Sequence, residues 1–177
     1  MNTIEWTLEG NSCVLNLGNQ RLVELITQCD THFYALILTK PYTISTAYWG
    51  KDTYTVMYKG NKIACLYHKD SNSSGNIAFN DQQLFNYQYH HKRGLRIFSK
   101  NFEEDAIIYQ RDNSSVKSRL SVRIGLEMTN LDVDRLLLLI TLGKLLFEYL
   151  CNHTNMGDAN NIGTRITEIE QNSFQLS

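Results

Sequence analysis

Residues 135–150, RLLLLITLGKLLFEYL, are the segment that most restricts how this chain can fold. Positions 136–140 are all leucine or isoleucine, so a helix over this segment has apolar side chains on nearly every side. A helix that is apolar nearly all round must be buried nearly all round. One sheet covers only one side of a helix, whereas a closed barrel surrounds it. The segment therefore predicts a buried central helix over about residues 131–152.

The start and the middle of this helix carry two further signals. Asn130 or Asp132 can cap its first turn, where the helix dipole also favours the charges of Asp132 and Asp134. Gly143 lies inside the helix, where glycine costs about 1 kcal/mol relative to alanine. Two explanations stay open for Gly143: a strand or large side chain approaches the helix closely there, or the glycine is tolerated without a role.

Up to about residue 126 the chain has the two-residue period of β-strands. Short runs rich in Tyr, Val, Ile, Thr, Leu and Phe are separated by Gly, Asn, Asp and Ser, which predicts short antiparallel strands. Tight turns are expected at Gly18-Asn19 and Gly60-Asn61, because two-residue hairpin turns need positive φ angles. About twelve strands are expected, over residues 4–9, 12–17, 20–27, 33–39, 42–49, 53–59, 62–69, 76–80, 83–89, 94–99, 105–111 and 117–126.

The last of these strands shows the clearest alternation. Its apolar and polar positions are Leu120, Val122 and Ile124 against Lys117, Arg119, Ser121 and Arg123. One buried and one hydrated face is what a barrel wall requires. Together with the helix, this predicts a mainly β fold, a closed antiparallel β-barrel of about twelve strands that encloses one apolar C-terminal helix. The barrel domain is expected to span residues 1–152, with a polar tail over 153–177.

Composition and charge indicate an ordinary soluble globular protein. Hydrophobic residues make up 42% of the chain, which argues against disorder. The net charge of -1 gives no global attraction to nucleic acid. The first residues lack the features of a secretory signal, and the apolar stretch 136–150 is shorter than the roughly 20 residues that a membrane span needs. We therefore expect a cytoplasmic protein with no transmembrane segment and no nucleic-acid partner.

No metal, cofactor or catalytic site is expected. The cysteines Cys13, Cys29, Cys65 and Cys151 are widely spaced and are interpreted as reduced, small hydrophobic residues. His90 and His91 are neighbours in a predicted strand and would point to opposite faces. The sequence has no G-x-S-x-G, G-x-G-x-x-G or P-loop motif, so we expect no catalytic residues. An enzyme with a site at the barrel mouth stays an alternative, because catalytic groups can assemble from distant positions.

Three kinds of passage carry a family resemblance. They are the segment Trp6-Thr7-Leu8-Glu9-Gly10, the segments 58–65 and 95–100, and the apolar segment 134–147. The first resembles the W-x-(I/V)-x-G strand start of one barrel family. The segments 58–65 and 95–100 resemble hairpins of that family, and the segment 134–147 resembles the helix that closes its fold. Over about residues 4–152 the chain thus resembles the Tubby-like barrel superfamily, and within it the LURP-one-related proteins, distant kin of phospholipid scramblases. The resemblance implies a barrel filled by its helix, with function on the outer wall. Tubby-type members bind phosphoinositide headgroups through basic outer residues.

A basic cluster is the candidate binding site. Its members are Lys92, Arg93, Arg96, Lys117, Arg119 and Arg123, and His90, His91 and Lys100 lie near them in sequence. Adjacent antiparallel strands would bring such groups together, and arginine and lysine are the usual binders of phosphate. The nearby Tyr87 and Tyr89 could rest at a membrane interface.

We therefore expect a non-catalytic binding or adaptor module that contacts anionic phospholipid headgroups or a protein partner. One alternative is an ordinary solvated face, in which Glu103, Glu104 and Asp105 balance the basic cluster. Another is a carrier of a small hydrophobic molecule, with an open lipocalin-type barrel and the helix packed outside.

Overall fold

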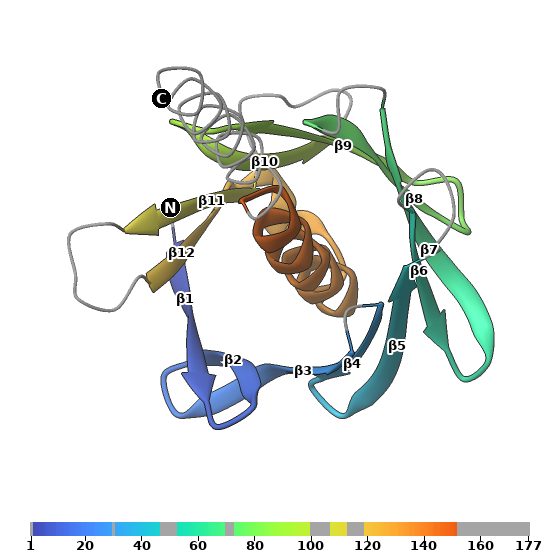
Figure 1. Cartoon of the computed structure of the whole chain (residues 1–177), viewed down its shortest axis with the longest axis horizontal. Helices are drawn as coiled ribbons and strands as arrows, with labels where there is room; N and C mark the ends of the chain where they lie inside the picture. Colours follow the sequence, from blue (N-terminus) through green and yellow to red (C-terminus); the bar gives the residue numbers. More distant parts are fainter. Residues whose placement is uncertain are drawn as a thin grey trace, which may run out of the picture.

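The chain forms one closed antiparallel barrel around a C-terminal helix (Figure 1). The computed structural model describes residues 2–29, 31–46, 53–69, 73–99, 107–112 and 119–151. Each strand pairs with its neighbours in sequence, and β1 pairs with β12 to close the barrel. A short 3₁₀ helix, η1 (Glu127–Asn130), leads from the last strand to the helix α1, residues 133–151. The predicted fold class is confirmed, and the predicted tail over 153–177 lies outside the described residues.

The twelve strands correspond one to one to the predicted runs, and two of them, β2 and β10, have the predicted bounds. The other bounds differ by at most three residues, and residues 47–49, 105–106 and 117–118 of the predicted runs lie outside the described ranges. The strands are β1 (Asn2–Glu9), β2 (Ser12–Leu17), β3 (Gln20–Cys29), β4 (His32–Ile37), β5 (Lys40–Thr46), β6 (Thr53–Tyr58), β7 (Asn61–His68), β8 (Ser74–Phe79), β9 (Leu84–His90), β10 (Gly94–Ser99), β11 (Ile107–Asp112) and β12 (Arg119–Ile124).

One of the two predicted turns is shifted by one residue. Gly18-Asn19 connects β2 to β3 as expected, with a φ of 59° at Gly18. Between β6 and β7 the turn is Lys59-Gly60, because Tyr58 and Asn61 face each other as the last pair of the ladder. Lys59 and Gly60 have φ angles of 48° and 78°. Positive values at both central positions are what a type I′ turn needs.

The helix α1 is buried on all sides. Every residue from Leu137 to Phe147 is buried, a stretch of about three helical turns. The barrel wall supplies the other half of the core through alternate residues of each strand, such as Leu95 and Ile97 of β10 and Val122 of β12. The interior that a lipocalin-type carrier would keep open is therefore occupied by α1. No helix in the described ranges has the length and apolar character to cross a bilayer.

The close-approach explanation for Gly143 is confirmed. Tyr109 of β11 is fully buried and lies against the helix, where its hydroxyl donates a hydrogen bond of 2.7 Å to the carbonyl oxygen of Ile140. A Cβ atom on Gly143 would lie 2.3 Å from both Cζ and the hydroxyl oxygen of Tyr109. Burial raises the pKa of the Tyr109 phenol well above its ordinary value, so the group stays a hydrogen-bond donor.

Two polar residues, Thr141 and Lys144, lie within the buried stretch of α1, and both have partners. Thr141 donates a hydrogen bond of 2.8 Å to the carbonyl oxygen of Leu137. The ammonium of Lys144, whose side chain is 4% exposed, forms an ion pair with Glu148 and lies 5.9 Å from the ring centroid of Trp6. A buried charge is tolerated only when it is paired, so Glu148 is what allows Lys144 to face the barrel wall.

Replacing Gly143 by alanine should destabilise the fold by about 1–3 kcal/mol, the usual range for overpacking, although alanine is the better helix former. In urea unfolding, the Tyr109→Leu background should reduce this penalty because the clashing ring is gone, whereas Tyr109→Phe should not. Equal penalties for Gly143→Ala in all three backgrounds would show that the ring contact does not set the cost.

Removing Glu148 and removing the charge of Lys144 should lower the free energy of unfolding by different amounts. Removing Glu148 with Glu148→Ala leaves the buried Lys144 ammonium unpaired and should cost about 1–2 kcal/mol, below the range for a fully buried pair because Glu148 is half exposed. Lys144→Met removes the charge that needed a partner and should cost less. The control Glu24→Ala breaks the exposed pair with Arg21 and should change the free energy of unfolding by no more than about 1 kcal/mol. Lys144→Met costing more than Glu148→Ala would contradict this assignment.

Candidate functional site

The structure describes four of the six predicted basic side chains, and all four are on the outside of the barrel. Lys92 and Arg93 lie in the exposed turn between β9 and β10. Arg96 of β10 and Arg123 of β12 point outward, because their neighbours along each strand face the core. Of Arg119 only the backbone in β12 is described, while Lys117 and Lys100 lie outside the described residues.

Arg96 and Arg123 lie in one row across the barrel wall. Arg96 is opposite Ile108 of β11, and Ile108 is opposite Arg123 of β12. At the usual strand spacing this places the two arginine backbones about 10 Å apart. The guanidinium of Arg123 also donates a hydrogen bond of 2.9 Å to the side-chain oxygen of Gln110. We call Lys92, Arg93, Arg96 and Arg123 the basic wall.

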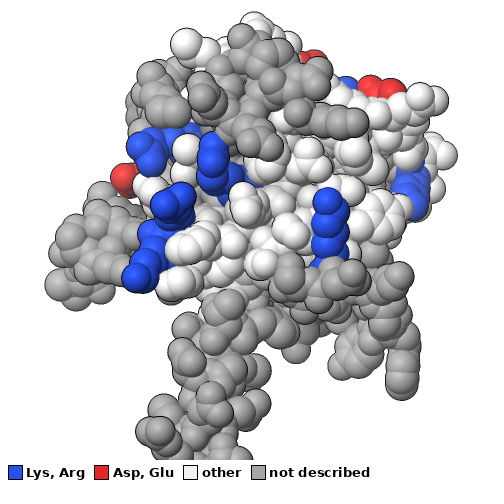
Figure 2. All heavy atoms as spheres, turned by 90° about the horizontal axis from the view of Figure 1, so that it is seen from above, with Lys and Arg blue, Asp and Glu red and all other residues white. Residues whose placement is uncertain are grey.

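Among the described side chains, positive charge predominates on the face that carries the basic wall, while Glu103, Glu104 and Asp105, which were expected to balance it, lie outside the described residues. Among the described side chains that point outward from β9 to β12, Arg96 and Arg123 are the charged ones. Figure 2 shows most of the lysine and arginine of the face that carries β9 and β10 toward one side, with others farther across, and aspartate and glutamate at its margins. The face is bounded at β1, where Glu5 lies opposite Ser121, two residues from Arg123.

Two expectations for the neighbours of the basic wall are wrong. Tyr87 faces inward and is 1% exposed, and Tyr89 packs against Phe147 with a centroid distance of 6.1 Å, so these rings belong to the core side of β9. His90 and His91 do not point to opposite faces; their rings stack at a centroid distance of 4.6 Å. The alternation rule fails there because His90 ends β9 and His91 already belongs to the turn.

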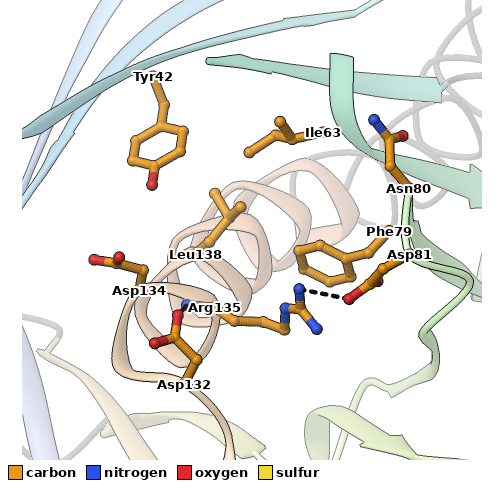
Figure 3. Close-up of a pocket in the computed structure, with 9 residues that line it drawn as sticks. All are labelled: Tyr42, Ile63, Phe79, Asn80, Asp81, Asp132, Asp134, Arg135 and Leu138. Atoms are coloured by element: carbon orange, nitrogen blue, oxygen red, sulfur yellow. Dashed lines mark hydrogen bonds and ion pairs between the residues drawn. The ribbon is translucent and has the colours of Figure 1, made fainter. Parts of the chain in front are cut away.

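A pocket at the mouth of the barrel, where α1 begins, is a second candidate site (Figure 3). It has a volume of about 270 Å³ and combines residues from β5, β7, the β8–β9 turn and the start of α1. We call it the mouth pocket. Its lining is Tyr42, Ile63, Phe79, Asn80, Asp81, Asp132, Asp134, Arg135 and Leu138. No single stretch of sequence contains this set, and sequence reasoning missed it.

Arg135 anchors one side of the mouth pocket. Its guanidinium forms an ion pair of 2.8 Å with Asp81 and donates a hydrogen bond of 2.5 Å to the side-chain oxygen of Gln83. It also lies 4.9 Å from the ring centroid of Phe79. Desolvation acts to raise the pKa of Asp81, but hydrogen bonds from Arg135 and from the backbone of Gln83 outweigh it and hold that pKa below its ordinary value.

The start of α1 supplies the other two carboxylates. Asp132 is the residue that caps the helix, since its side chain accepts the backbone N–H of Arg135 at 3.3 Å. Asp134 forms an ion pair with Lys40 of β5, and the hydrogen bond from that ammonium to Asp134 raises the pKa of Lys40. Asp81 and Asp134 are thus each held by a cation.

The chemistry of the mouth pocket favours binding over proton transfer. Burial, followed by the negative charge of Asp134, raises the pKa of Tyr42, so its phenol stays protonated at neutral pH. A protonated phenol can donate or accept a hydrogen bond but is a poor base. Within the described ranges, no group of three or more His, Cys, Asp or Glu side chains is placed to hold a metal ion.

Comparison with known proteins gives no relative: no family model, curated protein or solved structure matches the chain. The fold alone defines its class, an antiparallel β-barrel filled by its own C-terminal helix.

The four cysteines are reduced thiols, and three of them are buried or partly buried as expected. Cys29, at the end of β3, is exposed instead. Its sulfur lies 3.5 Å from the hydroxyl of Thr31 and 3.6 Å from Nδ1 of His32. Hydrogen bonds, chiefly from Thr31 and then from His32, lower the pKa of Cys29 to about 7.

Cys29 should therefore be the most reactive thiol of the chain. Because the thiolate is the nucleophile, alkylation of Cys29 by iodoacetamide should rise with pH around a midpoint of about 7, as measured by mass spectrometry of the modified peptides. Thr31→Val should move the midpoint upward, toward the ordinary value of a thiol. A wild-type midpoint already at that ordinary value would refute the role of Thr31.

Proposed function

We propose that the chain is a non-catalytic binding module of the Tubby-like or LURP-one-related type, and that its basic wall binds anionic phospholipid headgroups. The observation that carries the proposal is the row formed by Arg96 and Arg123, with Lys92 and Arg93 in the turn beside it. The closed barrel around an inner helix is also the architecture that the family resemblance implies.

The chemistry of the row suits phosphate. A guanidinium offers several N–H donors in a planar fork, which matches phosphate oxygens, whereas lysine contributes a point charge. Two arginines about 10 Å apart, with two further cations in the turn, suit a headgroup with more than one phosphate or several neighbouring lipids. Ile108 separates the two arginines in the row and adds an apolar contact at the same level.

The proposal places binding on the surface, because α1 occupies the barrel interior. It also assigns the protein to the cytoplasm, where the membrane leaflet is rich in anionic lipids and attracts basic segments by about 1 kcal/mol per lysine or arginine. A partly exposed basic face with no other charged side chain described on β9–β12 is suited to such an attraction.

The test is co-sedimentation of the full chain with phosphatidylcholine vesicles that contain either phosphatidylinositol 4,5-bisphosphate or no anionic lipid. We expect binding to the anionic vesicles only, weakening with added salt as the charges are screened. The double variant Lys92→Glu/Arg93→Glu should bind at least about tenfold more weakly, since two favourable charges become repulsive.

The matched control is Lys59→Glu/Lys62→Glu, which makes the same change of net charge in the exposed β6–β7 hairpin. It should retain most of the binding, and both double variants should keep the circular dichroism of the wild type. Equal losses of vesicle binding in the two double variants would show that binding depends on net charge alone and not on the basic wall. Absence of wild-type sedimentation with the anionic vesicles would refute the proposal.

A further inference from the structure

The mouth pocket is lined by a nearly buried tyrosine, Tyr42, whose hydroxyl opens into the pocket. Tyr42 is 5% exposed, and Figure 3 shows its hydroxyl directed into the pocket toward the start of α1. No residue in the described part of the chain forms a hydrogen bond with that hydroxyl. The ring of Tyr42 packs against the ring of Tyr58, with a centroid distance of 5.0 Å. A phenolic hydroxyl that faces a pocket and bonds to no protein group can donate to or accept from a ligand.

The charges around the mouth pocket leave one carboxylate without a counter-ion. Arg135 pairs with Asp81, and Lys40 pairs with Asp134. Asp132 is exposed at the rim of the pocket and forms no ion pair with any described residue, and its side chain accepts the backbone N–H of Arg135. Counting the three aspartates against Arg135 and Lys40 gives a net charge of -1, partly offset by the positive end of the helix dipole.

The apolar part of the pocket faces these polar groups. Leu138, Ile63 and Phe79 line it together with the ring of Tyr42 (Figure 3). The volume of about 270 Å³ lies just below the range of pockets that hold drug-sized ligands. A fitting ligand is therefore small, with an apolar body.

From this arrangement we propose that the mouth pocket binds a small organic ammonium ion, with its apolar body on Leu138 and Ile63. The ammonium donates hydrogen bonds to the carboxylate of Asp132, which has no counter-ion among the described residues, and to the phenolic oxygen of Tyr42, which has no hydrogen-bond partner among them. An anion is disfavoured, although it would suit a bare helix start, because Asp132 and Asp134 already occupy that position. The site is separate from the basic wall, so the inference does not depend on the proposed lipid binding.

The test uses the full chain and three probes of nearly the same size: 2-phenylethylamine, the neutral 2-phenylethanol and the anion 3-phenylpropionate. Binding is measured by isothermal titration calorimetry and by saturation-transfer NMR at neutral pH. We expect the amine to bind at least about tenfold more tightly than the alcohol, which lacks the charge, a factor that corresponds to about 1.4 kcal/mol. The carboxylate should bind most weakly of the three.

Two conservative variants test the assigned contacts. Tyr42→Phe removes only the hydroxyl, and Asp132→Asn removes the charge while it keeps an oxygen that can cap α1. Each should weaken amine binding by about tenfold or more without a matching loss for the alcohol. The controls Tyr58→Phe and Glu24→Gln make the same chemical changes outside the pocket lining and should bind the amine as the wild type does.

Three results would overturn the inference: no amine binding at millimolar concentration, equal binding of the carboxylate, or unchanged affinity in both pocket variants. The lipid-binding variant Lys92→Glu/Arg93→Glu should leave amine binding unchanged, so failure of the two proposals can be told apart. Saturation transfer to the phenyl group of the amine but not to that of the alcohol would locate the preference in the ammonium group.

Discussion

The need to keep α1 out of water on every side is the constraint on which the rest of the structure depends. An amphipathic helix could have packed on an open sheet, but the stretch from Leu137 to Phe147 has no face that tolerates water. A barrel of about eight strands has an interior just wide enough for its own side chains. The twelve strands observed here give a wider cylinder, and the helix takes the place that side chains or a ligand occupy in smaller barrels. The close contact between Gly143 and Tyr109 shows how little space remains.

The filled interior moves any binding function to the outer wall and the two ends of the barrel. Because successive strands reverse direction, the β9–β10 turn with Lys92 and Arg93 lies at the end opposite to the one where α1 begins. The mouth pocket lies at the end where α1 begins, between the helix and the β8–β9 turn. The mouth pocket and the β9–β10 turn thus lie at different ends of the barrel, and Arg96 and Arg123 lie on the outer wall between β9 and β1.

Local sequence patterns were enough to predict the strands, the helix and its enclosure, because each depends on the period of apolar residues. These patterns failed where a single backbone angle or a residue distant in sequence determines the local structure. Lys59 adopts a positive φ, which a lysine does not predict. The stacking of His90 on His91 depends on the residue at which β9 ends. The mouth pocket joins Tyr42 to Asp132 and Leu138, nearly a hundred residues away, so no spacing rule could find it. The lowered pKa of Cys29 depends on a turn that brings Thr31 and His32 back to the sulfur.

The order of elements along the chain has a consequence for synthesis. The strand that closes the barrel is the twelfth, it pairs with the first, and the helix that fills the cylinder follows it. A nascent chain on the ribosome therefore exposes the apolar side of strand after strand before α1 emerges. Contacts between residues so far apart in sequence are slow to form, and exposed apolar strands are prone to aggregate. The helix α1, which follows all twelve strands, is thus the segment whose arrival ends the exposure of their apolar sides to water.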